Sequence, residues 1–191
     1  MRILVAEDET LIRLDLCELL ERAGHEVCAQ AKDGAEAVTL ARTLQPDIAV
    51  LDVKMPRLDG IEAARRILDQ RPIPVVIVSA YTERALVDRA VESGVFGYLA
   101  KPFREEDVVP ALATAVARFE ELSAVREQVE SLSEALAARK AIERAKGILM
   151  EREQLTESEA FARLRTASQV SGKPMRVIAE AVIAALAPAE A

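Results

Sequence analysis

Aromatic residues are scarce in this chain: tryptophan is absent, and phenylalanine and tyrosine make up only 3% of its 191 residues. A hydrophobic core must therefore rest on leucine, valine, isoleucine and alanine. Apolar residues still reach 51%, which argues against global disorder. The length suits one ordinary domain and a smaller one.

Metal-ligand spacings and membrane segments are also missing. The chain has one histidine, His25, and two cysteines, Cys17 and Cys28, which we expect to be free buried thiols. No apolar run approaches the roughly 20 residues that span a bilayer, and no secretory signal opens the chain. We therefore expect a cytoplasmic protein with no membrane partner. The formal net charge of −7 argues against a protein that coats nucleic acid by charge alone.

Short apolar runs that read as buried strands alternate with helical patterns in the first part of the chain. The expected strands are residues 2–6, 26–31, 47–52, 74–79 and 95–100. The expected helices are a leucine-rich stretch that ends at Gly24, then residues 35–44, 61–69 and 84–93. This alternation predicts an α/β fold with a parallel sheet. Right-handed crossovers then bring the carboxyl ends of all strands to one edge of the sheet.

Polar side chains gather at that edge. The strand ends supply Glu7, Asp8, Asp52, Ser79 and Lys101. Carboxylates this close repel each other unless a cation joins them, and a hard ion such as Mg²⁺ suits oxygen ligands. One aspartate could then act as a nucleophile and form an aspartyl phosphate. A hydroxyl and an ammonium nearby would hold the phosphoryl oxygens.

The segment after Glu105 has a different character, because Pro110 is its only proline or glycine before Gly147. Residues 119–137 read as a helical linker with an apolar heptad seam of about two repeats, formed by Leu122, Val125, Val129, Leu132 and Leu136. Sustained coiled coils usually need three or four heptads. The pattern leaves open a dimerising coil and a helix packed against its own chain. Residues 138–187 predict a small all-α domain of three helices.

Residues 1–118 resemble the receiver domain of two-component response regulators. The resemblance is carried by Glu7-Asp8, Leu51-Asp52, Met55-Pro56, Asp59-Gly60, Ser79-Ala80, Tyr98 and Lys101-Pro102. It implies a flavodoxin-like fold with a five-stranded parallel sheet in the order 2-1-3-4-5.

The receiver resemblance also implies roles for the residues at the strand ends. A histidine kinase would phosphorylate Asp52. Mg²⁺ would be held by Asp8, Asp52 and the backbone carbonyl of Lys54, with Glu7 acting directly or through water. Ser79 and Lys101 would bind the phosphoryl oxygens, Tyr98 would swing inward as a switch, and the bond before Pro102 would be cis. Many receivers carry two aspartates where this chain has Glu7-Asp8, and the longer Glu7 puts direct metal contact in question.

Basic residues concentrate near the C-terminus. Residues 139–176 hold nine basic and five acidic residues inside an otherwise acidic protein. The sequence of residues 138–150 resembles the ANTAR domain, and so do Glu159-Ala-Phe-Ala-Arg-Leu-Arg165 and Ala167. That resemblance implies an output module that binds paired RNA stem-loops, usually as a dimer, in transcription antitermination. The expected RNA contacts are Arg139, Arg144, Lys146 and Arg165.

These features are compatible with three functions. The favoured one is a phosphorylation-switched RNA-binding regulator that can pair as a homodimer on activation. The alternative is a response regulator whose helical domain binds protein or DNA. A Mg²⁺-dependent phosphohydrolase that uses Asp52 is disfavoured, because no general-base histidine accompanies it, so we expect no enzyme.

Overall fold

The computed structural model describes residues 1–80 and 94–186. These residues fall into two compact units, Met1–Ser123 and Ala124–Ala191. The helix expected at residues 84–93 lies outside the described residues.

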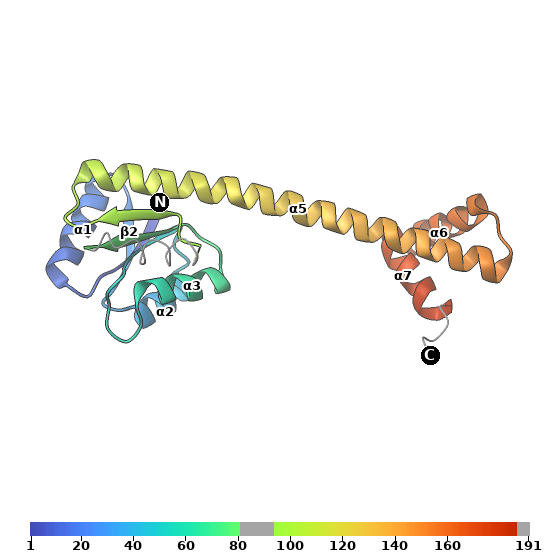
Figure 1. The fold of residues 1–191 in the computed structure, drawn as a ribbon, viewed down its shortest axis with the longest axis horizontal. Coiled ribbons are helices and arrows are strands. Elements are labelled where there is room, and N and C mark those ends of the chain that lie inside the picture. Colours follow the sequence, from blue (N-terminus) through green and yellow to red (C-terminus); the bar gives the residue numbers. More distant parts are fainter. Residues whose placement is uncertain (81–93, 187–191) are drawn as a thin grey trace. The chain divides into compact units, whose positions relative to one another are not determined.

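The first unit is built on a five-stranded parallel sheet in the order β2-β1-β3-β4-β5, with helices on both faces (Figure 1). Its strands are β1 (Arg2–Ala6), β2 (Glu26–Ala31), β3 (Ile48–Asp52), β4 (Val75–Ser79) and β5 (Gly97–Ala100). All five expected strands are present, and the flavodoxin-like order is confirmed. Every residue of β3 and β4 is buried, as befits central strands covered on both faces.

Helices cover both faces of this sheet. The helices that pack on it are α1 (Thr10–Arg22), α2 (Gly34–Leu44), α3 (Gly60–Gln70) and the first turns of α5 (Glu105–Glu153). One core cluster joins α2 and α3 to one face through side chains such as Ala37 and Ile67. The other joins α1 and α5 to the opposite face through Leu20 and Leu112.

Local capping fixes where α2 and α3 begin. The carboxylate of Asp33 accepts a hydrogen bond from the Glu36 amide at 3.0 Å, and that of Asp59 accepts one from the Glu62 amide at 2.8 Å. Each cap satisfies an amide that the first helical turn leaves without a partner. The Asp59 cap thereby fixes the end of the loop that connects β3 to α3.

Helix α5 is a single helix of 49 residues, in which the expected linker and the first expected helix of the C-terminal domain are continuous. Pro110 lies near its start, where a missing amide is tolerated. The heptad seam on α5 is exposed, from 41% at Leu122 to 71% at Leu132. Pairing of this seam with a second copy stays a prediction.

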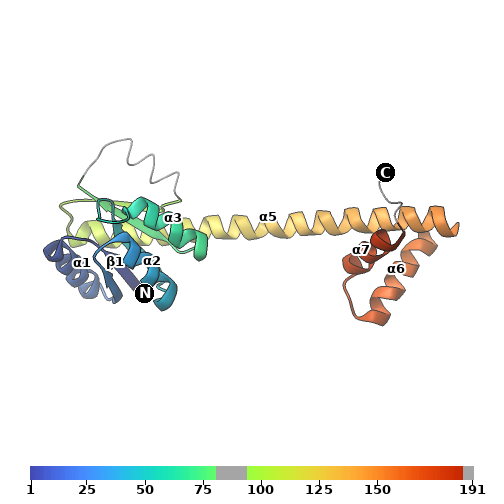
Figure 2. The ribbon, with the colours of Figure 1, turned by 90° about the horizontal axis from the view of Figure 1, so that it is seen from below.

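In the second unit, α6 (Glu157–Ser171) and α7 (Met175–Leu186) pack against the last turns of α5 (Figure 2). A reciprocal capping box between Thr156 and Glu159 starts α6, and Gly172, with a φ of +66°, ends it. The core here is thin: its fully buried residues are Ala145, Leu149, Ala160, Leu164 and Ala179. The expected three-helix arrangement is therefore present.

Candidate phosphoacceptor site and basic helical unit

The strand ends meet as the sequence predicts. Glu7 and Asp8 follow β1, Asp52 ends β3, Ser79 ends β4, and Lys101 follows β5. A cavity of about 630 Å³ opens at this edge. Its lining includes Asp8, Asp52, Lys54, Ser79 and Lys101. A parallel sheet places ligand sites at this edge because all its strands end there.

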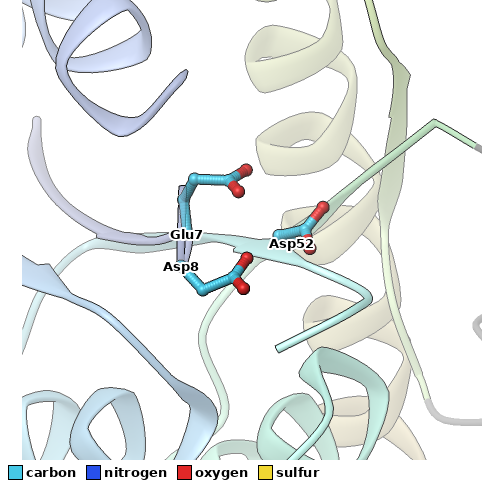
Figure 3. Close-up of side chains that lie close together, drawn as sticks. All are labelled: Glu7, Asp8 and Asp52. Atoms are coloured by element: carbon cyan, nitrogen blue, oxygen red, sulfur yellow. The ribbon is translucent and has the colours of Figure 1, made fainter. Parts of the chain in front are cut away.

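Three carboxylates converge at this edge of the sheet. One oxygen each from Glu7, Asp8 and Asp52 lies within 4.8 Å of the others, and Figure 3 shows the side chains of Glu7 and Asp8 extending toward Asp52. Glu7 and Asp52 are buried, at 1% and 4% exposure, while Asp8 is exposed. Three hard oxygen ligands at this spacing fit a divalent cation such as Mg²⁺.

Lys101 is the internal counter-ion of this group. Its Nζ lies 2.6 Å from Oε2 of Glu7 and 2.7 Å from Oδ1 of Asp52. The ammonium therefore balances two buried negative charges that would otherwise be costly.

The pKa values of these groups reflect burial and mutual charge. Burial, together with the nearby charge of Asp52, raises the pKa of Glu7 even though Lys101 opposes the shift. Burial likewise raises the pKa of Asp52 against the opposing effect of Lys101. Burial acts to lower the pKa of Lys101, but bonds to Asp52 and Glu7 outweigh it and the pKa is raised. An added cation would favour both carboxylates in their ionised form.

The remaining predicted residues of the receiver take different positions. Ser79 is buried and lines the cavity, and the backbone of Lys54 hydrogen-bonds the carboxylate of Asp52. Tyr98 is half-buried and packs against the core cluster on the α2 and α3 side of the sheet. The peptide bond between Lys101 and Pro102 is cis.

Two features of the site were not foreseen from the sequence. Arg57, with a φ of +66°, forms an ion pair with the buried carboxylate of Asp33, which ties the loop after β3 to the start of α2. A Cβ atom at Gly60 would lie 1.9 Å from the carbonyl oxygen of Asp52. The Asp59-Gly60 pair signalled a turn, but only the fold brings Gly60 against the end of β3.

The predicted RNA contacts divide into two kinds. Arg139, Arg144 and Arg165 are exposed, and within the described residues they form no ion pair. Lys146 is only 7% exposed, and its Nζ lies 2.6 Å from Glu157 and 3.0 Å from Glu143. Hydrogen bonds to Glu157 and Glu143 raise the pKa of Lys146. Lys146 thus joins α5 to the first turn of α6.

The chain belongs to the receiver-type response regulators that carry an ANTAR output domain. Residues 3–113 match the response regulator receiver domain, and residues 130–183 match the ANTAR domain. Receiver domains take phosphate from histidine kinases and bind Mg²⁺ in their acidic pocket, and ANTAR domains bind RNA. The family is one of signalling regulators and not of enzymes, in agreement with the expectation from sequence.

Named relatives cover either the whole chain or its receiver. The transcriptional regulatory protein PdtaR of Mycobacterium tuberculosis is 45% identical over 185 residues, which are 97% of this chain and 90% of PdtaR. The receiver domain of the response regulator NarL from the same species is 32% identical, with a TM-score of 0.58, over 61% of this chain and 95% of that one. The CheX–CheY–BeF3–Mg complex from Borrelia burgdorferi is 25% identical, with a TM-score of 0.57, over 59% of this chain and 86% of that one.

Within residues 1–80 and 94–186, no helix combines the length and the apolar character needed to cross a bilayer.

Proposed function

We propose that this protein is a two-component response regulator that a histidine kinase phosphorylates on Asp52 and that acts through RNA binding in transcription antitermination. The observation that carries the proposal is the joint arrangement of Asp52, two further acids and Lys101 at one sheet edge, in a chain that also holds an ANTAR domain. The proposed limits are a receiver at residues 1–118, a linker at 119–137 and an output domain at 138–187, in a cytoplasmic protein.

Mg²⁺ is the proposed cofactor of the receiver. Asp8, Asp52 and the backbone carbonyl of Lys54 would hold it, with Glu7 as a direct or water-mediated partner. The ion would neutralise charge on the phosphoryl oxygens during transfer. The Borrelia CheY complex contains Mg²⁺ and BeF3 by its description, which is compatible with this role. Ser79 and Lys101 would bind phosphoryl oxygens, and both line the same cavity as Asp52.

Phosphorylation would shift an equilibrium between two existing states, with Ser79 and Tyr98 as the switch. Ser79 pairs with the last residue of β5 in the sheet, two positions after Tyr98. A movement of Ser79 would therefore be transmitted to Tyr98 through the paired backbone of β4 and β5.

The output would be the binding of RNA stem-loops by Arg139, Arg144, Lys146 and Arg165. The exposed arginines are free to meet phosphates or loop bases. Lys146 is engaged with two carboxylates, so its contribution would require that these contacts be exchanged.

The proposed active form is a homodimer paired through the α5 seam. Leu122, Val129 and Leu136 occupy one core position of the heptad, and Val125 and Leu132 the other. In a parallel pair, Glu121 of one copy faces Arg126 of the second, a favourable charge contact at the flanking positions. The seam side chains are exposed, from 41% at Leu122 to 71% at Leu132, and such a partner would cover them.

Two experiments test this function. Acyl-phosphate labelling of the wild type and of Asp52→Asn should give a labelled wild type and an unlabelled variant, and labelling of the variant would contradict the assignment. Gel shifts should favour RNA hairpins over duplex DNA of equal length, in a salt-dependent manner. Equal binding of both would favour the alternative, a helical domain that binds protein or DNA.

A further inference from the structure

Gly147 lies inside helix α5, where nothing in its own unit requires a glycine. A Cβ atom built at Gly147 would meet no other atom within 4 Å. Glycine in a helix interior is unfavourable relative to alanine, because it loses more backbone entropy on folding. An alanine would therefore fit and would strengthen the helix, so the reason for this glycine lies outside the fold.

Gly147 also faces away from the core of the C-terminal unit. Ala145 and Leu149, two positions before and after it, are buried at 0% and 2% exposure. Residues two apart lie on opposite sides of a helix. The bare backbone at Gly147 therefore belongs to the surface side of α5, where a bound molecule can reach it.

Two cationic side chains lie on the N-terminal side of this point. Lys140 and Arg144, seven and three positions before Gly147, share its face of the helix and are exposed. In the described part of the chain, neither forms an ion pair. The nearest acid on this side, Glu143, is held by the ammonium of Lys146. The exposed Glu151, four positions after Gly147, ends the cationic stretch.

We infer that Gly147 is the point of closest approach between α5 and the sugar–phosphate backbone of a bound RNA, with Lys140 and Arg144 on the adjoining phosphates. The inference rests on the proposed RNA-binding function. A packed protein helix would need apolar side chains around the glycine, whereas only Met150, 38% exposed, lies within one turn of it on this side. A side-chain-free backbone beside two free cations on the same helix face suits a bulky anionic chain.

The test uses the full-length protein and RNA hairpins selected against the wild type from a randomised-loop library. Gly147→Ala and Gly147→Leu should weaken binding progressively, in the range of about fivefold to a hundredfold, because added atoms at a close contact force the partners apart. The melting temperature of Gly147→Ala should match or exceed that of the wild type. Ser131→Ala, an exposed change on the same helix, is the matched control and should leave the affinity unchanged.

Three outcomes would overturn the inference. One is a Gly147→Leu variant that binds the selected hairpins as tightly as the wild type. Another is a fall in the melting temperature of Gly147→Ala, which would give the glycine a structural role. A third is a change in oligomeric mass with unchanged RNA affinity, which would place a protein helix there. A wild type from which no hairpin can be selected would instead contradict the proposed function itself.

Discussion

Leu164→Ala should unfold much of the C-terminal unit while leaving the receiver intact. Leu164 is 1% exposed on α6 and, with Leu149, is one of only two large side chains among the fully buried residues of this core. The other three buried residues are alanines, and the larger side chains that pack against the cluster, such as Ile178 and Val182, are only partly buried. The loss should therefore fall in the middle of the usual range for this substitution.

The expected magnitude follows from the atoms removed. Three carbon groups at about 0.8 kcal/mol each give roughly 2.4 kcal/mol of lost transfer free energy. The cavity that remains raises the total to about 3–4 kcal/mol. A unit of roughly 70 residues has a free energy of unfolding of about 3–10 kcal/mol. The substitution should therefore remove between a third and nearly all of the stability of this unit.

Hydrogen exchange of the full-length variant, read by mass spectrometry of its peptides, is the assay. Peptides from residues 139–186 should lose protection, and peptides from the central strands of the receiver should keep theirs. Val170→Ala on the same helix, at a side chain 84% exposed, is the control and should change stability by less than about 0.5 kcal/mol. A cost below about 1 kcal/mol for Leu164→Ala, or lost protection in the receiver, would refute the reasoning.

Further predictions concern the two units in turn. Gly60→Ala should destabilise the receiver by about 1–3 kcal/mol or more and reduce acyl-phosphate labelling, whereas Gly147→Ala, where a methyl group fits, should do neither. Lys146→Met should lower the melting temperature of the C-terminal unit. The pKa of Glu157 is lowered by its bond to Lys146. The stability that this ion pair contributes is therefore complete above about pH 4.5 and is lost as the pH falls through the lowered pKa. A Lys146→Met variant whose unfolding at acid pH is the same as that of the wild type would contradict this. Burial raises the pKa of the Cys17 thiol to about 11, so about one thiol in a thousand is ionised at pH 8, and alkylation by iodoacetamide should be slow until the protein unfolds.

The receiver could be predicted from the sequence because its information is local. Each buried strand is a short apolar run, and a polar residue stands at its carboxyl end, so the convergence of Glu7, Asp52 and Lys101 followed from the parallel arrangement alone. The order of the strands came from the resemblance and not from the pattern. All five strands end where expected, and three of them begin one or two residues later than expected, at Ile48, Val75 and Gly97.

Contacts between distant segments had no local signal. Two contacts form only when α2, α3 and β3 are packed together. One is the close approach of Gly60 to Asp52, where an added Cβ atom would lie 1.9 Å from the carbonyl oxygen. The other is the ion pair of Arg57 with Asp33. Lys146 was grouped with the RNA contacts because of its charge. Its spacing of four after Ile142 and three before Leu149 already placed it beside the core stripe of α5.

The exposed heptad seam on α5 has a consequence for how the response depends on the amount of protein in the cell. If a second copy covers it, as proposed, pairing is a second-order process, and the population of active protein grows with the square of the amount phosphorylated when that amount is small. Doubling expression would then raise output about fourfold at low signal, so the number of molecules in a cell would set the stimulus at which its transcripts respond.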